Sequence, residues 1–269
     1  MNAAEVKLLA EKYFEEVRSY RRYLHMHPEL SFQEHATAAY VQQQLTALGL
    51  EVRPGIAGTG LTAMVKGRGD SKQTIALRAD MDALPIHETN DVPYRSVNEG
   101  VMHACGHDAH TACLLGAAHI LQETRDQWSG NIQLIFQPGE EKLPGGASKM
   151  IAEGVLKNPP VQAIFGQHVY TPFEVGTVAF CPGKMMASTD ELYITVKGKG
   201  GHGAYPGATL DPVPVAAQII TALQLLVSRF HSPIEPIVLT IGKVIAEGAT
   251  NIIPDQVYME GTLRTFNES

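Results

Sequence analysis

The chain has 269 residues, of which 44% are hydrophobic and 18% charged, and its formal net charge is -7 at pH 7. That length and composition indicate a globular protein with a substantial core, folded as one large domain or two ordinary ones. The negative charge comes without acidic or basic runs. Neither nucleic acid nor an anionic membrane surface is therefore expected as a partner.

The N-terminal segment 1–16 is charged and has helical periodicity, unlike a basic start followed by an apolar stretch. No uninterrupted apolar run approaches the ~18 residues that span a bilayer, so we expect a cytoplasmic protein without a membrane partner. The three cysteines, Cys105, Cys113 and Cys181, are irregularly spaced and odd in number. This pattern argues against a disulfide framework and favours a thiolate ligand for at least one of them.

The first part of the chain alternates between helix and strand patterns. Helical spacing of apolar residues predicts a helix over 3–24, and Ser31 with Glu34 predicts a capping box for a second helix that ends at Leu48. Further strands are expected at 61–66, 74–78, 131–136 and 161–165, and further helices at 107–123 and 146–153. This alternation predicts an α/β domain with a mostly parallel sheet.

After about residue 187 the pattern changes. A strand at 191–197 precedes a glycine-rich turn at 198–207, a helix from Asp211 to about 229, and strands at 237–244 and 256–266. The order β-α-β-β is two-thirds of a split βαβ unit, as in ferredoxin-like folds. We therefore expect one domain over 1–187 and a second, incomplete α+β domain over 188–269.

The polar clusters of the first domain follow predicted strands. Asp80 and Asp82 follow the strand at 74–78, Glu140 and Glu141 the strand at 131–136, and His168 the strand at 161–165. Ligands of open α/β sheets bind beyond the carboxyl ends of the strands, so these groups are predicted to converge. The segment MHACGHDAH at 102–110 begins a helix and can join them there.

This segment holds the densest group of metal-binding side chains. Gly106 lets the backbone turn so that the Cys105 thiolate and the His107 imidazole can reach one metal ion. The alternative is a buried thiol beside a helix-capping histidine. His103 and His110 are left outside the metal set, and His110 could lie on the surface of the helix.

Glu140 and Glu141 follow an apolar strand and a Pro-Gly turn. Adjacent side chains point in different directions, so one glutamate can bind a metal while the other faces a water, an arrangement suited to hydrolysis. The alternative is a solvated pair in a surface loop. His168 is interpreted as a further ligand rather than a hydrogen-bonded core histidine, and Asp82 as a carboxylate that holds a ligand imidazole.

Two other histidine groups carry less signal on their own. His202 lies in a glycine-rich turn, where isolated polar residues are common. The pair His25 and His27 precedes Pro28 and is interpreted as structural, closing the first helix.

Several motifs together make the sequence resemble a known family. They are RYLHMHPEL (22–30), LRADMDALP (77–85), MHACGHDAH (102–110), FQPGEE (136–141), GQH (166–168), GGH (200–202) and NIIPD (251–255). In this order they resemble the metal-dependent amidohydrolases that include hippurate hydrolases, N-acyl-amino-acid deacylases and auxin-conjugate hydrolases. These enzymes are a branch of the aminoacylase and carboxypeptidase superfamily, and the resemblance extends over essentially the whole chain.

The resemblance implies a role for each site residue. Two divalent metal ions (Zn, Mn, Co or Ni) would be bound by Cys105, His107, Glu141 and His168. Glu140 would be the general base and later the proton donor. The part after residue 187 would be a lid and dimerisation domain that forms a homodimer. In similar enzymes the histidine that matches His202 comes from the partner subunit and stabilises the developing oxyanion, and the residue that matches Asn251 lies near the substrate.

The chain departs from the family pattern in two respects. Family members continue well beyond residue 269 and supply a final ligand histidine, so both domains are expected to be incomplete in this chain. Asp80 stands where more distant relatives have a ligand histidine, which leaves a metal role for Asp80 open.

The expected function is metal-dependent hydrolysis of the amide bond of an N-acyl amino acid or a similar small molecule. The first alternative is a non-catalytic metal- or ligand-binding fragment that is inactive without the missing part. The second is a thiol redox protein that uses Cys105, which has no partner in a C-x-x-C arrangement.

Overall fold

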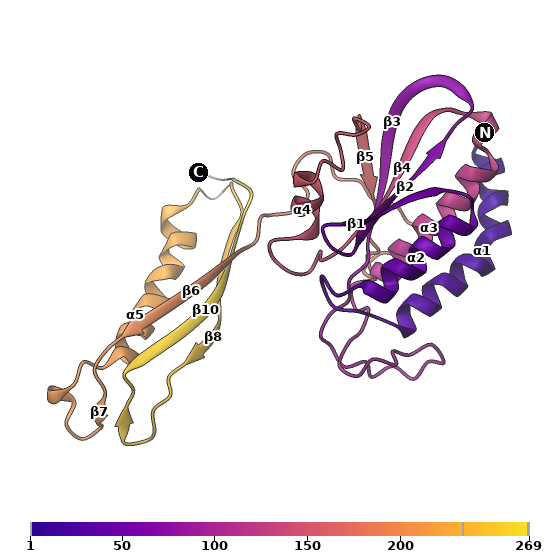
Figure 1. Cartoon of the computed structure of the whole chain (residues 1–269). Coiled ribbons are helices and arrows are strands. Elements are labelled where there is room, and N and C mark those ends of the chain that lie inside the picture. The colour runs from indigo at the N-terminus through magenta and orange to yellow at the C-terminus, as the bar shows by residue number, and fades with distance from the viewer. Residues whose placement is uncertain (1, 233, 268–269) are drawn as a thin grey trace. The chain divides into compact units, whose positions relative to one another are not determined.

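The structure is a computed structural model and describes residues 2–232 and 234–267. The chain divides into two compact units, Met1–Glu174 and Val175–Ser269 (Figure 1). The boundary predicted at residue 187 lies between this division and Asp190, where the first strand of the second unit begins.

The first unit contains a five-stranded sheet with helices on both faces. Its strands lie in the order β1-β2-β4-β3-β5, and only β2 runs opposite to the others, because β3 pairs in parallel with β4 and β5. The predicted α/β fold with a mostly parallel sheet is confirmed. Its elements are α1 (Ala3–Met26), α2 (His35–Ala47), β1 (Glu51–Ile56), β2 (Gly60–Lys66), β3 (Gly69–Asp80), α3 (His107–Glu123), β4 (Ser129–Gln137), α4 (Gly146–Ala152) and β5 (Ala163–Gly166).

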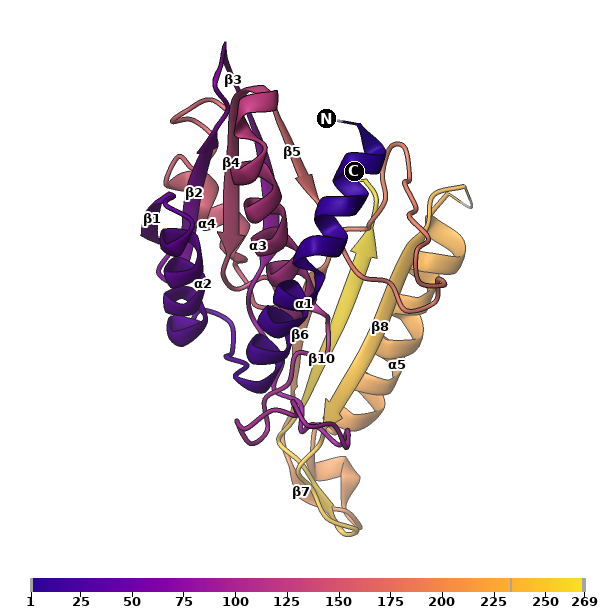
Figure 2. The ribbon, with the colours of Figure 1, turned by 90° about the vertical axis from the view of Figure 1, so that its right-hand side faces the viewer.

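Two apolar cores hold this sheet between its helices. The larger core joins α1, α2 and α3 to one face of the sheet through fully buried side chains such as Leu24, Leu45, Leu115 and Phe136. A smaller core includes Met150 of α4. Figure 2 shows α1, α2 and α3 beside the strands of the sheet. With both faces packed, the sheet gives a firm base to the residues that follow its strands.

Two local features of this unit differ from the sequence prediction. Strand β1 was not predicted, because its residues EVRPGI contain a proline and a glycine and have little strand pattern. Helix α2 begins at His35 without a side-chain hydrogen bond from its N-cap residue, so the predicted capping box is wrong. Instead, the Glu29 carboxylate accepts hydrogen bonds from the N–H groups of Ala36 and Thr37.

The second unit contains a three-stranded antiparallel sheet in the order β6-β10-β8, with α5 packed on one face. Its order of elements is the predicted β-α-β-β. The elements are β6 (Asp190–Lys197), β7 (Gly201–His202), α5 (Pro212–Leu225), β8 (Ile237–Ile245), β9 (Ile252–Ile253) and β10 (Gln256–Thr265). The side chain of Asp211 caps α5 by accepting from the Val213 N–H group, as the sequence indicates.

The helical segment Pro212–Phe230 has 19 residues and a mean hydropathy of 1.5, enough in length and composition to cross a membrane. This finding qualifies the expectation from the sequence, which considered only uninterrupted apolar runs. One such helix is weak evidence for a membrane span, because a mostly buried core helix passes the same test, although only 6% of this window is buried. Within its unit, Ala216 of this helix is buried against the sheet.

Candidate metal centre

The three parallel strands β3, β4 and β5 deliver the candidate residues to one edge of the sheet. Asp80 pairs with Gln137 in the register of β3 and β4, and Arg78 pairs with Gly166 in that of β3 and β5. The residues that follow these strands therefore start at the same level, and α3 begins there with His107. The structure thus brings together the groups that the sequence places beyond the strand ends.

Three overlapping groups of potential ligand atoms lie at this edge. Each group consists of atoms within 4.8 Å of one another, and His107 belongs to all three. The first group contains Cys105, His107 and His168, with 3.3 Å between Cys105 Sγ and His168 Nε2. The other groups are Asp80 with His107 and His110, and His107 with Glu140 and Glu141.

The His107 ring is held by Asp82 through the backbone oxygen of that residue. Its Nδ1 lies 2.8 Å from the backbone oxygen of Asp82 and 3.3 Å from Asp82 Oδ1. A proton on Nδ1 is donated to the Asp82 backbone oxygen and leaves the Nε2 lone pair free. Burial opposes a charged ring, but the hydrogen bond to Asp82 and the nearby carboxylates outweigh it and raise the pKa of His107.

His107 Nε2 is buried and has no hydrogen-bond partner in the part of the chain that the structure describes. It lies 3.7 Å from Asp80 Oδ2 and 3.8 Å from Glu141 Oε1. These distances are too long for hydrogen bonds. They match the separation of about 3–4 Å between two ligand atoms that bind the same metal ion. A buried lone pair that faces two carboxylates therefore fits a bound cation.

Gly106 allows Cys105 and His107 to lie so close to His168. Its φ is +89°, in the left-handed region that favours glycine, and a Cβ atom here would lie 2.2 Å from Val169 Cγ2. The turn before α3 and the segment after β5 can thus touch only because residue 106 has no side chain.

His110 is buried, which corrects the idea that it could lie on the helix surface. Its Nδ1 lies 2.7 Å from Asp80 Oδ1, and its Nε2 accepts a hydrogen bond of 2.9 Å from the N–H group of Val169. Arg78 Nη1 donates to the other oxygen of Asp80 at 2.7 Å. This chain of contacts links β3 to the backbone next to His168, so His110 and Asp80 hold that segment in place.

The charges at the site shift the pKa values of its acids. Burial opposes the ionisation of Asp80, but the hydrogen bond from His110 and the charge of Arg78 outweigh it and lower the Asp80 pKa to about 2. Burial and the carboxylate of Glu141 raise the pKa of Cys105 to about 12. Burial, then the charge of Glu141, also raises the pKa of Glu140. A bound cation would lower the pKa values of Cys105 and Glu140 and so stabilise their charged forms.

A second buried network lies behind the site and surrounds His25. Its Nδ1 lies 2.7 Å from Asp108 Oδ2 and its Nε2 lies 3.0 Å from Glu88 Oε1, while Arg21 Nε pairs with Asp108 at 2.8 Å. His27 instead bonds to the Tyr23 carbonyl within α1. Both histidines are thus structural. Sequence reasoning missed Arg21 and Glu88, because they are distant in the chain and lie outside any short motif.

His202 and Asn251 lie together in the second unit. The short strand pair β7-β9 joins Gly201 to Ile253 and His202 to Ile252, and the Gly203 N–H group donates to the Asn251 carbonyl at 2.7 Å. His202 Nδ1 accepts from the Ala204 N–H group at 3.1 Å, so its Nε2 carries the proton of the neutral ring.

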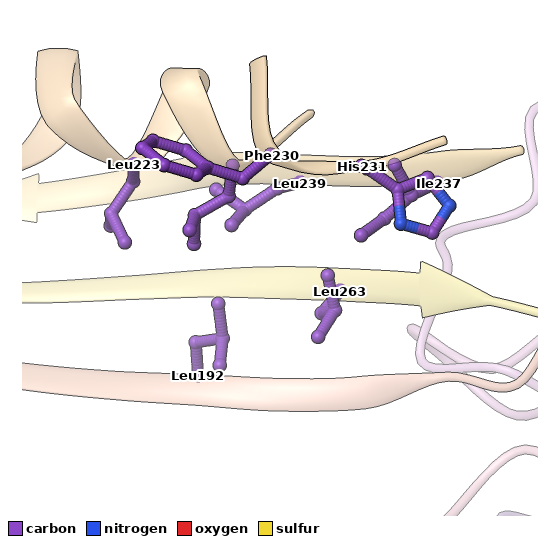
Figure 3. Close-up of a pocket in the computed structure, with 8 residues that line it drawn as sticks. Leu192, Leu223, Phe230, His231, Ile237, Leu239 and Leu263 are labelled. Carbon is purple, nitrogen blue, oxygen red and sulfur yellow. The ribbon is translucent and has the colours of Figure 1, made fainter. Parts of the chain in front are cut away.

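A separate groove of about 320 Å³ lies in the second unit, between the end of the α5 segment and the sheet (Figure 3). Its lining is almost wholly apolar, with one histidine and no carboxylate, so it has no set of groups for metal-assisted hydrolysis. The residues that line it are Leu192, Leu223, Leu226, Phe230, His231, Ile237, Leu239 and Leu263.

Comparison with known proteins identifies the family. Residues 76–260 match the family described as Peptidase family M20/M25/M40. The chain is 45% identical to the N-acyl-L-amino acid amidohydrolase of Geobacillus stearothermophilus over 271 aligned residues, which cover 100% of this chain and 72% of that protein. The chain belongs to peptidase family M20.

Other members of family M20 are also similar to this chain over most of its length. The chain is 45% identical to the N-acetyl-L-cysteine deacetylase of Bacillus subtilis over 92% of its own length, and it spans 58% of that relative. Its fold matches a crystal structure of a Staphylococcus aureus protein described as an aminohydrolase, with a TM-score of 0.90 and 40% identity over 98% of this chain and 70% of the other.

A second solved structure concerns metal binding. It is a Bacillus subtilis protein described as a dinuclear metal binding peptidase from the M20 family, with 40% identity, a TM-score of 0.78, and coverage of 96% of this chain and 66% of the other. The family M20 relatives are named as hydrolases of amide bonds, and membership supports a hydrolytic enzyme. The chain spans between 58% and 72% of the length of these relatives.

Proposed function

We propose that this protein is a metal-dependent hydrolase that cleaves the amide bond of N-acyl amino acids or similar small amides. The observation that carries the proposal is the convergence of Cys105, His107, Glu141 and His168 from separate segments, with Glu140 beside them. The names of the M20 relatives, an N-acyl-L-amino acid amidohydrolase and an N-acetyl-L-cysteine deacetylase, support the substrate class.

In this proposal, two divalent cations are held by Cys105, His107, Glu141 and His168. The mixed sulfur, nitrogen and oxygen donors suit zinc, manganese, cobalt or nickel, and the unpartnered Nε2 of His107 supports their fit. When bound, such ions lower the pKa of a coordinated water and polarise the amide carbonyl. Asp82 holds the His107 ring through Nδ1, so that Nε2 keeps its orientation.

Glu140 acts as the general base and then as the proton donor. It takes a proton from the attacking water and returns it to the nitrogen of the leaving amine. The direction of its pKa shift suits both steps, because burial and the Glu141 charge raise the pKa of Glu140 towards neutrality.

The second unit supplies two further groups in this proposal. His202 stabilises the oxyanion that develops on the substrate carbonyl and acts from the partner subunit of a homodimer that forms through this unit. Its proton on Nε2 leaves a donor for that role. Asn251, next to it in the β7-β9 region, contacts the substrate. We place the protein in the cytoplasm.

The test replaces Glu140 by glutamine and measures amine release from hippurate and N-acetyl amino acids, together with metal content. Glu140→Gln should keep the metal and lose at least ~100-fold in turnover, the usual scale for loss of a general base. Glu153→Gln is the matched control, because the Glu153 carboxylate binds the Ala57 N–H group and no candidate ligand. Near-normal turnover in Glu140→Gln would exclude the proposed role.

A second candidate is a metal- or ligand-binding protein without turnover. It requires only the ligand groups of the candidate metal centre, whatever the roles of Glu140 and His202. The same measurements separate the two candidates. This candidate predicts stoichiometric metal binding and no amine release from any substrate of the panel, whereas a hydrolase releases amine and loses this activity on chelation.

A further inference from the structure

Glu34 is a fully buried carboxylate, at 0% exposure, in the turn between α1 and α2. Burial of a carboxylate is unfavourable unless several hydrogen bonds compensate for the lost water. No lysine or arginine pairs with it within the described part of the chain. The hydrogen bonds of its two oxygens must therefore compensate for the burial of this carboxylate.

The two oxygens of Glu34 accept three hydrogen bonds, one from its own segment and two from distant segments. Oε1 accepts from the Phe32 N–H group at 2.9 Å and from the Gly139 N–H group at 2.8 Å. Oε2 accepts from Thr59 Oγ1 at 2.5 Å. Gly139 is 105 positions away in sequence and directly precedes Glu140, so this bond is a tertiary contact with the loop that carries the proposed base.

The backbone of this loop, 137–141, is fixed on both sides of Glu140. Before Glu140, Gln137 O accepts from the Met81 N–H group, and Gly139 O accepts from the Gly146 N–H group at 2.9 Å. After it, the Glu141 N–H group donates to Asp82 Oδ2 at 3.0 Å. Pro138 has no N–H group, so the bond from Gly139 to Glu34 is the nearest N–H anchor before Glu140.

The residues next to Glu34 contact the same site. The Ser31 hydroxyl donates to Asp82 Oδ2 at 2.6 Å. Phe32 adopts a φ of +64°, and its ring lies against Gly139, where a Cβ atom would be 2.4 Å from the ring. A left-handed phenylalanine is unfavourable by about 1 kcal/mol or more and is accepted only where surrounding contacts demand it. The segment 31–34 thus contacts Asp82 through Ser31, and it contacts Gly139 through Phe32 and Glu34.

We propose that Glu34 is a positioning residue that fixes the Gly139 backbone and thereby orients Glu140 and Glu141. This inference rests on the proposed function of those two glutamates. Glu34 touches no reacting atom. Its role depends on the length of its side chain, which lets an oxygen accept from the Gly139 N–H group. The role does not depend on negative charge at the site.

Two substitutions separate the effect of side-chain length from the effect of charge. Glu34→Gln keeps the length, and its amide oxygen can accept from Phe32 and Gly139 while its NH₂ group donates to Thr59. Glu34→Asp keeps the charge but is one methylene shorter, so it cannot span from Thr59 to Gly139. The same two substitutions at Glu29, whose carboxylate also accepts two backbone N–H groups, are the matched control.

The first readout is hydrogen exchange at the Gly139 amide of the whole chain, without added metal. Glu34→Asp should increase the exchange rate there at least ~10-fold, whereas Glu34→Gln should stay close to wild type. The second readout is Zn²⁺ affinity by calorimetry, which should fall about 10-fold in Glu34→Asp, the lower end of losses for groups that orient ligands. The Glu29 variants should change neither quantity.

The proposal is overturned if Glu34→Asp exchanges like wild type at Gly139, or if Glu34→Gln is as impaired as Glu34→Asp. It is also overturned if the Glu29 variants increase the exchange rate of the Gly139 amide as much as Glu34→Asp does. The increase would then reflect a general loss of stability. A wild-type chain that binds no Zn²⁺ would contradict the proposed metal centre. The exchange readout would still decide the role of Glu34.

Discussion

Gly106 and Val169 lie in direct contact, and a Cβ atom added to Gly106 would be 2.2 Å from Val169 Cγ2. Gly106 separates two of the proposed ligands, Cys105 and His107, and Val169 follows a third, His168. One close contact between two non-polar residues therefore sets how near three proposed ligands come to one another.

Gly106→Ala should weaken Zn²⁺ binding at least ~10-fold, because the added methyl group displaces Val169 and with it His168. The measurement is calorimetric titration with Zn²⁺. Gly100→Ala is the control, since Gly100 also has a positive φ, +74°, but no atom within 4 Å of the added Cβ. That variant should lose about 1 kcal/mol of stability from backbone strain and keep its metal affinity. Equal Zn²⁺ affinity in the two variants would refute this account of Gly106.

Metal addition should stabilise the fold through Cys105. A ligand present at 100 times its Kd raises the free energy of unfolding by about 2.7 kcal/mol. Cys105→Ser should remove most of that Zn²⁺-dependent rise in the urea unfolding midpoint, and chelation should abolish amine release. Cys181→Ser, at an exposed cysteine of the second unit, should respond to Zn²⁺ like wild type. An unchanged response in Cys105→Ser would remove Cys105 from the ligand set.

His25 should make stability depend on pH. The hydrogen bond to Asp108 raises the pKa of His25 above 6.5, against the effect of burial and with the help of Glu88. A raised pKa in the folded state stabilises the protein fully below pH 6.5, and this contribution is lost as the pH rises through the folded-state value.

His25→Gln should therefore be destabilising by about 3 kcal/mol at pH 6, because it leaves the buried Glu88 carboxylate without its cation and Asp108 with Arg21 alone, and by less at pH 9. Urea unfolding midpoints at the two pH values test this. His27→Gln is the control, because His27 contacts the carbonyl and ring of Tyr23 and forms no ion pair among the described residues. A destabilisation that is equal at pH 6 and pH 9 would contradict a raised pKa of His25 in the folded protein.

His202→Ala should reduce turnover about 100-fold with little change in KM, because a donor to the oxyanion acts mainly in the transition state. Metal content should stay the same, since none of the proposed ligands belongs to the second unit. His231→Ala, a histidine of the apolar groove in the same unit, should keep its activity. An increase in KM alone would instead make His202 a substrate-binding residue.

Ser31 and Glu34 show where reasoning from sequence fails. Their spacing matches a capping box, which is a local pattern, yet both side chains bind groups far away in sequence, Asp82 and Gly139. The cap of α2 comes from Glu29 instead. A buried acceptor binds whichever donors the fold brings to it, and the local spacing carries no information about those donors.

The sequence by itself determined the α/β class of the first unit, the β-α-β-β order of the second, and the family. Strand and helix patterns are local, and residues at the ends of parallel strands meet at one edge because of strand direction alone. This is why Asp82, Glu140, Glu141 and His168 could be grouped in advance.

Only the tertiary structure decided how these groups are held. The hydrogen bonds between His110 and Val169, between His25 and Glu88 and between Glu34 and Gly139 join segments that have no common sequence pattern. Buried polar groups must find partners wherever the packed chain places them, so these contacts are a property of the packing. The cluster MHACGHDAH was visible from the start, but its geometry depends on a valine 63 residues after Gly106.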